Sequence, residues 1–345
     1  MPWSELSWSA PGLAGWLLLH LSIGLGGTWL ARRYALRRRL LDQPGARRSH
    51  AAPTPRGGGV AVLAALLLAS LWLAWRAHAG GGSGLLPVLA FAAGLALVGG
   101  SGWLDDHRPV APWKRLAAHV LASAAFALAL AADGAAAWAV ALAFLAPLAL
   151  TNVWNFMDGI DGIAASQALL VAAGIALWAT GAWWWLALAL LAACAGFLPW
   201  NLPRARIFLG DAGSGSLGFA LGALLAAALA GADGAGAWLL LLLPSAFLLD
   251  AGLTLGRRML RGERWWAPHV EHGYQLLARR IGRHGPVTAL YALWTLCPLA
   301  ILMSGRDFSF TSISISLPAW YASGAVLWFL IRRARDLPRE VENRE

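Results

Sequence analysis

Two segments of the chain carry carboxylates at positions where a divalent cation could bind. Asp105 and Asp106 are adjacent at the end of one apolar run, and Asp211 lies in the sequence Gly-Asp-Ala-Gly-Ser directly before another. Hard divalent cations such as Mg²⁺ take oxygen ligands, carboxylates above all. Backbone N–H groups at a glycine-rich turn that opens a helix also bind phosphate. These residues indicate metal-assisted chemistry on a phosphate, although a solvated acidic pair and an aspartate that caps a helix would explain each segment alone.

A third segment, residues 152–162, mixes acids and amides with glycines and large apolar residues. Its polar side chains include Asn155, Asp158 and Asp161. Glycine lets the backbone approach a ligand more closely than any other residue does. A loop that only faced solvent would not need the phenylalanine, methionine and isoleucine that lie between these polar residues. We therefore interpret the segment as functional rather than as an ordinary surface loop.

Basic side chains accompany the acids. Lys114 is the single lysine among 27 lysines and arginines. A role for a compact ammonium group against a phosphate would explain this, and retention by chance explains it equally well. His269 and His272 lie in an arginine-rich segment without further His or Cys nearby, so contact with phosphate is a better interpretation than a metal site. Carboxylates for Mg²⁺ and cations for phosphates are what phosphoryl transfer requires.

The composition places these residues in a membrane protein. Of 345 residues, 59% are hydrophobic and only 13% are charged, whereas about a quarter of the residues in soluble domains are charged. This excludes a soluble enzyme and a disordered chain. The net charge of +10 does not indicate nucleic acid, because the arginines lie in short loops between apolar runs, where they orient the chain and contact anionic headgroups. The two cysteines lie inside apolar runs and cannot form a cysteine-based zinc site.

Apolar segments recur along the whole chain, and a helix that crosses a bilayer needs about 20 such residues. The eleven predicted spans are Leu13–Leu30, Val60–Trp75, Leu85–Gly100, Leu116–Ala132, Ala135–Leu150, Ile163–Thr180, Ala182–Leu198, Ser216–Ala230, Ala237–Leu255, Pro286–Met303 and Ile313–Ile331. We expect an all-α, polytopic membrane protein. With the N-terminus outside and the C-terminus inside, 25 of the 27 basic residues fall on the inside, as the positive-inside rule requires.

This topology places the candidate chemistry on one membrane face. We expect a single integral membrane domain, residues 1–345. Its inside loops are residues 31–59, 101–115, 151–162, 200–215 and 256–285. A transporter or lipid-carrier flippase is the alternative from another functional class, but it would need a polar route through the bilayer. The spans offer only isolated groups such as His20 and His119.

Taken in order, these segments resemble the polyprenyl-phosphate N-acetylhexosamine-1-phosphate transferases, the glycosyltransferase family 4 group that contains the bacterial MraY, WecA and TagO enzymes. The matching motifs are Asp42–Gly58 with D-x-P-x-x-R-K/R-x-H-x-x-P-T/V-P-x-x-G-G, Asp105-Asp106 with Lys114, Asn155–Gly162 with N-x-x-D-G-x-D-G, Phe208–Ser214 with F-M-G-D-x-G-S, and Asp250 with Arg257 and Arg258. Each motif is weak alone, whereas five in register over nearly the whole chain are specific.

The resemblance implies a reaction and a setting. The phosphate of a polyprenyl carrier, usually undecaprenyl phosphate, attacks the β-phosphorus of a UDP-N-acetyl sugar, and UMP leaves. The implied cofactor is Mg²⁺, with Mn²⁺ as a substitute. The implied partners are the two substrates and a second copy of the chain in a homodimer, with no nucleic acid. The implied location is the bacterial cytoplasmic membrane, with the active site facing the cytoplasm.

The resemblance also implies a role for each candidate residue. Asp211 would be the main Mg²⁺ ligand, and Asp105 and Asp106 would orient the metal or the lipid phosphate, with Asp105 as a candidate base. Asp158 and Asn201 would hold uridine, and Phe208 would stack on uracil. The implied catalytic residues are Asp105, Asp106, Lys114, Asp158, Asp161 and His272. The implied substrate-binding residues are Arg47, His50, Arg56, Asn155, Asn201, Phe208 and His269.

One segment departs from the family pattern. The best-known members carry D-R-x-H-x-H-H in the last large loop, where this chain has the stretch His269–Gln275, His-Val-Glu-His-Gly-Tyr-Gln. This form is more similar to the branch that starts O-antigen or related cell-envelope glycans, some of which use 6-deoxy amino sugars. The resemblance therefore implies UDP-GlcNAc or a related amino sugar as the donor and argues against the peptidoglycan precursor.

Overall fold

The computed structural model describes residues 10–43, 52–82, 84–264, 267, 269–304 and 308–333. These residues form α-helices, one 3₁₀ helix and one pair of short strands. The elements are α1 (Ala10–Arg38), β1 (Leu41–Asp42), β2 (Thr54–Pro55), α2 (Val60–Ala79), α3 (Leu85–His107), α4 (Pro112–Ala132), α5 (Ala137–Met157), α6 (Ile163–Ala176), α7 (Gly181–Asn201), α8 (Gly210–Ala230), η1 (Ala235–Leu242), α9 (Ser245–Leu260), α10 (Gly273–Ile281), α11 (His284–Ser304) and α12 (Phe310–Arg333).

The prediction of an all-α, polytopic membrane protein is confirmed. Among the described residues, nine helices are long and apolar enough to cross a membrane, and the bent pair of η1 and α9 makes up to ten. The predicted span Ile163–Thr180 is the shorter helix α6, with 14 residues. At 1.5 Å per residue, α6 reaches about 21 Å, which is less than the ~30 Å of a bilayer core. Every predicted span contains helix, but α6 by itself is shorter than a bilayer core.

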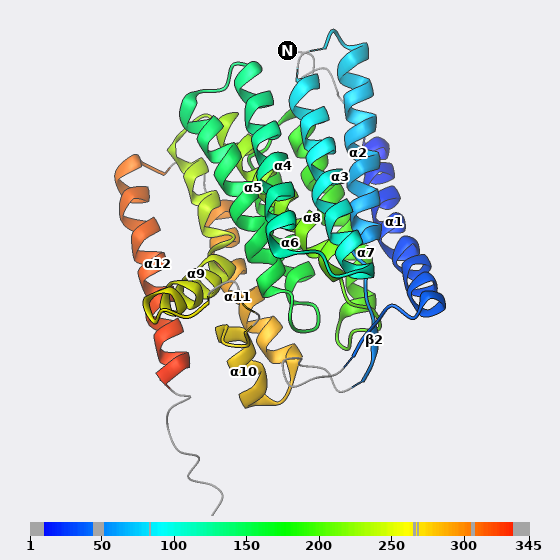
Figure 1. Ribbon diagram of the computed structural model, residues 1–345. Helices are drawn as coiled ribbons and strands as arrows, with labels where there is room; N and C mark the ends of the chain where they lie inside the picture. Colours follow the sequence, from blue (N-terminus) through cyan, green and yellow to red (C-terminus); the bar gives the residue numbers. More distant parts are fainter. Residues whose placement is uncertain are drawn as a thin grey trace, which may run out of the picture.

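The predicted span Ala237–Leu255 is not one straight helix. It is divided between η1 and α9, which meet at an angle of 58°. Pro244 lies at the break, in the position before the first turn of α9. Proline has no N–H to donate and its ring clashes with the preceding turn, so a helix does not continue straight through it. After the break α9 turns away from the bundle (Figure 1), and its last turn carries Arg257 and Arg258.

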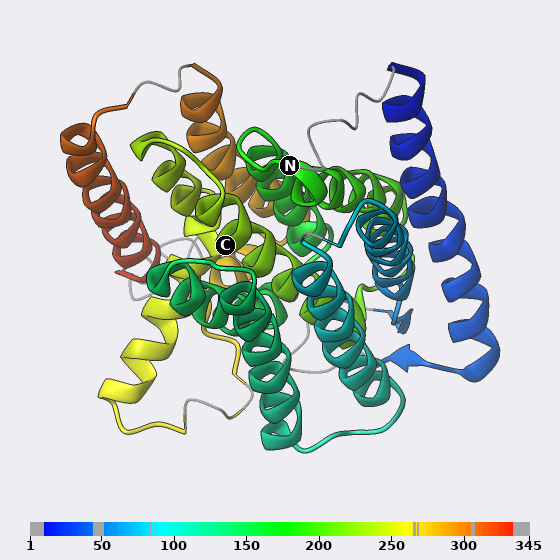
Figure 2. The same ribbon diagram turned by 90° about the horizontal axis from the view of Figure 1, so that it is seen from above.

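Helix α8 forms the centre of the bundle. Its apolar window is completely buried, and it packs against α3 and α5. Gly218 and Gly222 make this approach possible, because a Cβ atom on Gly218 would overlap the Leu150 carbonyl oxygen and one on Gly222 would lie 2.5 Å from Pro147. Small residues four positions apart let helix backbones touch within a membrane. The least buried candidate spans, α1 and α12, lie on opposite sides of the bundle (Figures 1 and 2).

Short backbone contacts join the loops at one end of the bundle. Strands β1 and β2 pair antiparallel, with Asp42 opposite Thr54, and lie at the same end as α10 (Figure 1). The Phe208 N–H donates to the Pro55 carbonyl at 2.8 Å, and the Gly58 N–H donates to the Phe208 carbonyl at 2.9 Å. The loop before α2 is thereby joined to the loop before α8, so residues far apart in the sequence form one surface.

Candidate active site

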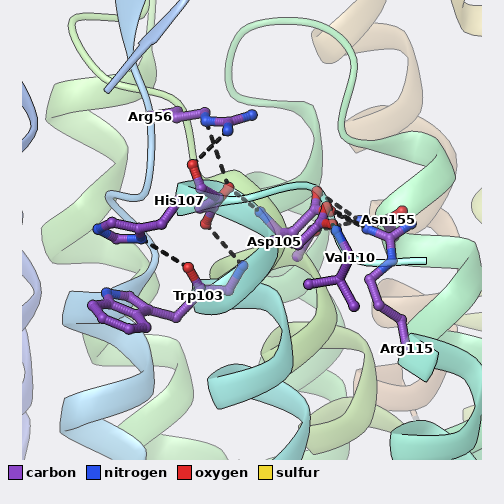
Figure 3. Close-up of polar contacts among 11 residues, drawn as sticks. Arg56, Trp103, Asp105, His107, Val110, Arg115 and Asn155 are labelled. Atoms are coloured by element: carbon purple, nitrogen blue, oxygen red, sulfur yellow. Dashed lines mark hydrogen bonds and ion pairs between the residues drawn. The ribbon is translucent and has the colours of Figure 1, made fainter. Parts of the chain in front are cut away.

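A cavity of about 260 Å³ lies among these loops. Its lining residues are Asp42, Arg56, Asp106, Asn155, Asp158, Gly159, Ile160, Asn201, Phe208, Gly210, Asp211, Ser214 and Gln275. All five predicted inside loops contribute to this wall, and half of the predicted site residues are part of it. The sequence motifs therefore converge on one place, and Figure 3 shows the polar contacts at its centre.

Asp106 fixes the beginning of α8. Its carboxylate accepts the backbone N–H of Asp211 at 3.0 Å through Oδ1 and that of Ala212 at 3.2 Å through Oδ2. The side chain is almost fully buried, with 3% exposed. A negative charge at a helix N-terminus is favourable because the N–H groups there have no partner within the helix. The expectation that these N–H groups bind a substrate phosphate is therefore corrected, since the carboxylate of Asp106 already occupies them.

A glycine is required where Asp106 meets α8. Gly210 has a φ of +76°, which side chains rarely tolerate, and a Cβ atom there would lie 2.6 Å from Asp106 Oδ2. Gly102 of α3 is equally close, since its Cβ would overlap the backbone of Asp211. The glycines of both motifs therefore serve close packing between α3 and α8.

Arg115 is a central residue that the sequence analysis missed. Its guanidinium donates to Asp105 Oδ2 at 2.8 Å and also to Asp211 Oδ2. Asp105 accepts a further hydrogen bond from the Val110 N–H at 2.6 Å (Figure 3). One cation from α4 thus balances two carboxylates, which come from α3 and α8.

Lys114 does not contact this cluster, and its contact with a substrate phosphate stays a prediction. Its side chain is exposed, and its ammonium lies 5.5 Å from the centroid of the Trp113 ring. Both Lys114 and Arg115 lie in the first turn of α4, where successive side chains point about 100° apart around the helix axis. The side chain directed at the acids is that of Arg115.

Arg56 supplies positive charge on another wall of the cavity. Its guanidinium donates to the backbone carbonyl of Asp106, and its Nε lies 4.0 Å from the Asp106 carboxylate. About a third of its side chain, 32%, remains exposed and available to a ligand. The two other basic residues predicted from this loop, Arg47 and His50, lie outside the described residues.

The last turn of α5 and the residue that follows it bring an amide and an acid into the cavity. The Asn155 amide donates to Asp211 Oδ1 and to Ser214 Oγ, both at 3.1 Å. Asp158 follows directly after α5. Burial, and then the negative charges of Asp211 and Asp106, raise the pKa of Asp158 to about 8. Without a cation or substrate, this carboxyl group is therefore largely protonated at neutral pH.

Two predicted site residues hold the loops in place. Asp161 does not line the cavity, and its carboxylate lies 3.2 Å from His284 Nδ1 of α11. Asn201 lines the cavity, but its Oδ1 accepts the Gly162 N–H at 2.9 Å and its Nδ2 donates to the Ile207 carbonyl at 3.0 Å. Both ends of this amide are engaged with backbone. The structure therefore gives Asp161 and Asn201 positioning contacts.

The histidines of the last inside loop lie behind the cavity wall. His272 is 2% exposed and lies 4.0 Å from the Asp250 carboxylate, and the His269 ring lies 4.8 Å from the His272 ring. Burial lowers the pKa of His272. Burial and the adjacent His272 lower the pKa of His269 to about 4. Neither ring lines the cavity, so their contact with a substrate phosphate stays a prediction. Gln275, which was not predicted, is the residue of this loop that lines the cavity.

The predicted metal ligands are only partly gathered. Among the described residues, no group of three or more His, Cys, Asp and Glu side chains is arranged to hold a metal ion. Asp106 has both carboxylate oxygens on backbone N–H groups, whereas Asp105 and Asp211 share Arg115. Mg²⁺ is usually bound by one or two carboxylates together with water and substrate phosphates. Asp105 and Asp211, with the Asn155 amide beside Asp211, are the donors that fit such a site.

Comparison with known proteins shows which family the chain resembles. Residues 88–229 match the model of glycosyl transferase family 4. The chain is 30% identical over 331 residues to the decaprenyl-phosphate N-acetylglucosaminephosphotransferase of Mycobacterium leprae. The matched region covers 82% of this chain and 80% of that protein. It is 28% identical over 255 residues to the undecaprenyl-phosphate alpha-N-acetylglucosaminyl 1-phosphate transferase of Thermotoga maritima, covering 72% and 77%.

A third relative carries a different name. The chain is 32% identical over 199 residues to the phospho-N-acetylmuramoyl-pentapeptide-transferase of Synechococcus, covering 50% of this chain and 55% of that protein. All three relatives are named as transferases of an N-acetyl sugar, and the names of two include a polyprenyl phosphate, so the matches define one class of transferase. The chain belongs to the polyprenyl-phosphate N-acetylhexosamine-1-phosphate transferase family, as the motifs predict.

Proposed function

We propose that the protein transfers N-acetylhexosamine 1-phosphate from a UDP-sugar to undecaprenyl phosphate and releases UMP. An oxygen of the lipid phosphate forms a new bond to the β-phosphorus of the donor. The bond between that phosphorus and the oxygen bridging to the α-phosphate breaks, and the bridging oxygen leaves with UMP. The observation that carries the proposal is the single cavity in which Asp106, Asp158 and Asp211 meet Arg56 and Phe208. The names of the family relatives support it.

The attacking phosphate needs positive charge more than it needs a base. A phosphate monoester has a second pKa of roughly 6 and is mostly dianionic at pH 7. Its approach to a diphosphate is opposed by repulsion, which fixed cations reduce. Arg56 is half-buried at the cavity wall. Arg115 contacts the carboxylates of Asp105 and Asp211. We assign these two arginines to the phosphates of the substrates.

We propose Mg²⁺ as the cofactor, with Mn²⁺ as a substitute. Asp211 and Asp105 would hold it, and Asn155 would fix the orientation of Asp211 by its hydrogen bond. When bound, such an ion neutralises charge on the diphosphate and on the departing UMP. Arg115 now balances the same two carboxylates, so a cation bound there would free the guanidinium for a phosphate. Asp106 holds the start of α8 and thereby the backbone of Asp211.

The donor would occupy the side of the cavity formed by Asp158 and Phe208. Phe208 is held by two backbone hydrogen bonds and borders the cavity, where its ring can stack on uracil. A carboxyl group with a pKa of about 8 both donates and accepts hydrogen bonds near neutral pH, as the imide edge of uracil requires. Gln275 is the candidate for sugar contact, because Tyr274, its neighbour in the divergent stretch, is fully buried.

The setting follows from the same family. We propose UDP-GlcNAc or a related amino sugar, including 6-deoxy forms, as the donor, and the start of O-antigen or another cell-envelope glycan as the role. We further propose that the protein is a homodimer in the bacterial cytoplasmic membrane and that the cavity faces the cytoplasm. A transporter or flippase without transferase activity is the alternative that the assay must exclude.

The test is a direct assay of UMP release. Purified protein in detergent is incubated with undecaprenyl phosphate, Mg²⁺ and a panel of UDP-sugars, and the lipid product is identified by mass spectrometry. We expect UMP and lipid-linked sugar 1-phosphate in equal amounts, loss of both with EDTA, and recovery with Mg²⁺ or Mn²⁺. The variant Asp211→Asn should insert normally and be inactive. A lack of UMP release with every donor would reject the proposal.

A further inference from the structure

One buried carboxylate joins four helices behind the cavity. Asp250 of α9 is 2% exposed. Its oxygens accept hydrogen bonds from the Gly273 N–H at 2.6 Å, the Tyr274 N–H at 3.0 Å, the Tyr291 hydroxyl at 2.7 Å and the Trp328 indole N–H at 3.2 Å. These donors come from α10, α11 and α12. A buried carboxylate is stable only when it is fully hydrogen-bonded, and here its partners determine where three other helices lie.

The contact with α10 sets the point at which that helix begins. Gly273 and Tyr274 are the first residues of α10, and their N–H groups have no partner within the helix. Asp250 accepts both, one on each oxygen. A Cβ atom on Gly273 would lie 3.1 Å from Asp250 Oδ1, so only glycine fits without displacement. The carboxylate therefore fixes both the position and the rotation of α10.

Tyr274 extends this fixed point to the cavity. Its side chain is 1% exposed, and its hydroxyl donates to the Phe156 carbonyl at 3.1 Å. A Cβ atom on Gly159 would overlap the same hydroxyl. The tyrosine thus lies against the backbone on both sides of Asp158, which lines the cavity together with Gly159. Asp250 and Tyr274 do not line the cavity themselves.

We propose that Asp250 and Tyr274 are positioning residues that hold the segment 156–159, and with it Asp158, at the donor side of the cavity. The activity readout of this inference rests on the proposed function, whereas the structural readout does not. Displacement of a catalytic group by about 1 Å can cost roughly 100-fold in rate. Because the segment lies on the proposed uridine side, loss of the contact should act on the UDP-sugar more than on the lipid.

The matched experiment compares two tyrosines. Tyr274→Phe removes the hydroxyl that donates to Phe156 and keeps the buried ring. Tyr321→Phe removes an equivalent bond, from the Tyr321 hydroxyl to the Leu241 carbonyl at 2.7 Å, far from the cavity. For Tyr274→Phe we expect kcat/KM for the UDP-sugar to fall roughly 10- to 100-fold, with an unchanged KM for undecaprenyl phosphate. Amide hydrogen exchange of residues 156–162 should become faster, and Tyr321→Phe should change neither.

Asp250→Asn tests the other end of the contact. An asparagine offers one acceptor oxygen and turns an N–H₂ group toward the donors, so α10 loses part of its anchor. We expect faster exchange both at the start of α10 and in residues 156–162. Equal behaviour of Tyr274→Phe and Tyr321→Phe in activity and in exchange would overturn the inference. If the wild type shows no transferase activity but Tyr274→Phe still accelerates exchange in residues 156–162, the proposed function fails and the positioning role stands.

Discussion

The carboxylate of Asp106, at the end of α3, accepts the backbone N–H of Asp211 at the start of α8, at 3.0 Å. This bond joins the two acidic motifs of the chain through backbone rather than through a shared ion. Of two adjacent aspartates, Asp105 faces Arg115 and Asp106 faces the helix. The pair therefore divides into one residue directed at charged groups and one that builds the site.

This division predicts different consequences for the two acids. Asp106→Ala removes the anion from the first turn of α8 and should lower the free energy of unfolding by about 1–2 kcal/mol, the usual cost of a lost cap. Asp105→Ala should lower activity with a smaller loss of stability, because its partners are partly exposed. Thermal unfolding of both variants in detergent, run beside the UMP assay, measures the difference. Equal stability of Asp106→Ala and the wild type would contradict the assignment.

Neighbouring basic residues provide a second test. Arg115→Gln should lower kcat by roughly 10²–10³, the usual cost of losing one charged contact to a transition state. Lys114→Gln should stay near wild-type activity, because its ammonium lies over Trp113 and away from the acids. The two variants remove the same charge one residue apart, so each is the control for the other. A large loss in Lys114→Gln would restore Lys114 as the phosphate contact.

The pH dependence of stability reports on Asp158. Its pKa of about 8 in the folded protein is above the value of 3.8 that it has when unperturbed. The folded protein therefore holds the Asp158 proton more tightly than the unfolded chain does. The contribution of Asp158 to the free energy of unfolding is fully present below about pH 4 and is lost as pH rises toward 8. Without divalent cations, the melting temperature of Asp158→Asn minus that of the wild type should increase from pH 5 to pH 8. Above pH 8 this difference should stay constant. The exposed Asp133→Asn serves as control, and parallel curves for all three proteins would refute the prediction.

Sugar choice is expected to depend on Gln275. Its Oε1 accepts the His272 N–H at 3.2 Å, which fixes the side chain where it lines the cavity. Gln275→Ala should change the order in which UDP-sugars are used, whereas Val270→Ala, outside the cavity lining, should not. Competition assays with paired donors measure the order. An unchanged order in an active Gln275→Ala enzyme would place sugar recognition elsewhere.

The distribution of basic residues predicts the orientation of the chain in the membrane. The distribution of 25 basic residues inside and 2 outside predicts an external N-terminus and an internal C-terminus. A reporter that is active only in the cytoplasm should work when fused after Glu345, and one that is active only after export should not. The reverse pattern would mean that the chain has the opposite orientation in the membrane, with the cavity on the outer face.

The sequence predicts the helices and the collection of motifs well, because apolar length and loop charge are local properties. Asp158, Phe208 and Asp211 do meet in one cavity. The sequence does not predict which of two adjacent residues faces the site. Asp105 and Asp106, or Lys114 and Arg115, differ only by a rotation of about 100° around a helix, and that rotation is set by packing between helices. The break at Pro244, by contrast, could be predicted from the sequence, because proline itself interrupts a straight helix.

The complete burial of α8 has a consequence for how the protein responds to its bilayer. A change in hydrocarbon thickness acts on lipid-facing helices, which tilt or recruit flanking residues to correct the mismatch. Such adjustment falls most on α1 and α12, the least buried candidate spans, whereas the apolar window of α8 is completely buried. Asp211 is therefore attached to the element most insulated from membrane thickness. Reconstitution into short-chain and long-chain lipids should alter how the outer helices sit while leaving the spacing of the acids unchanged.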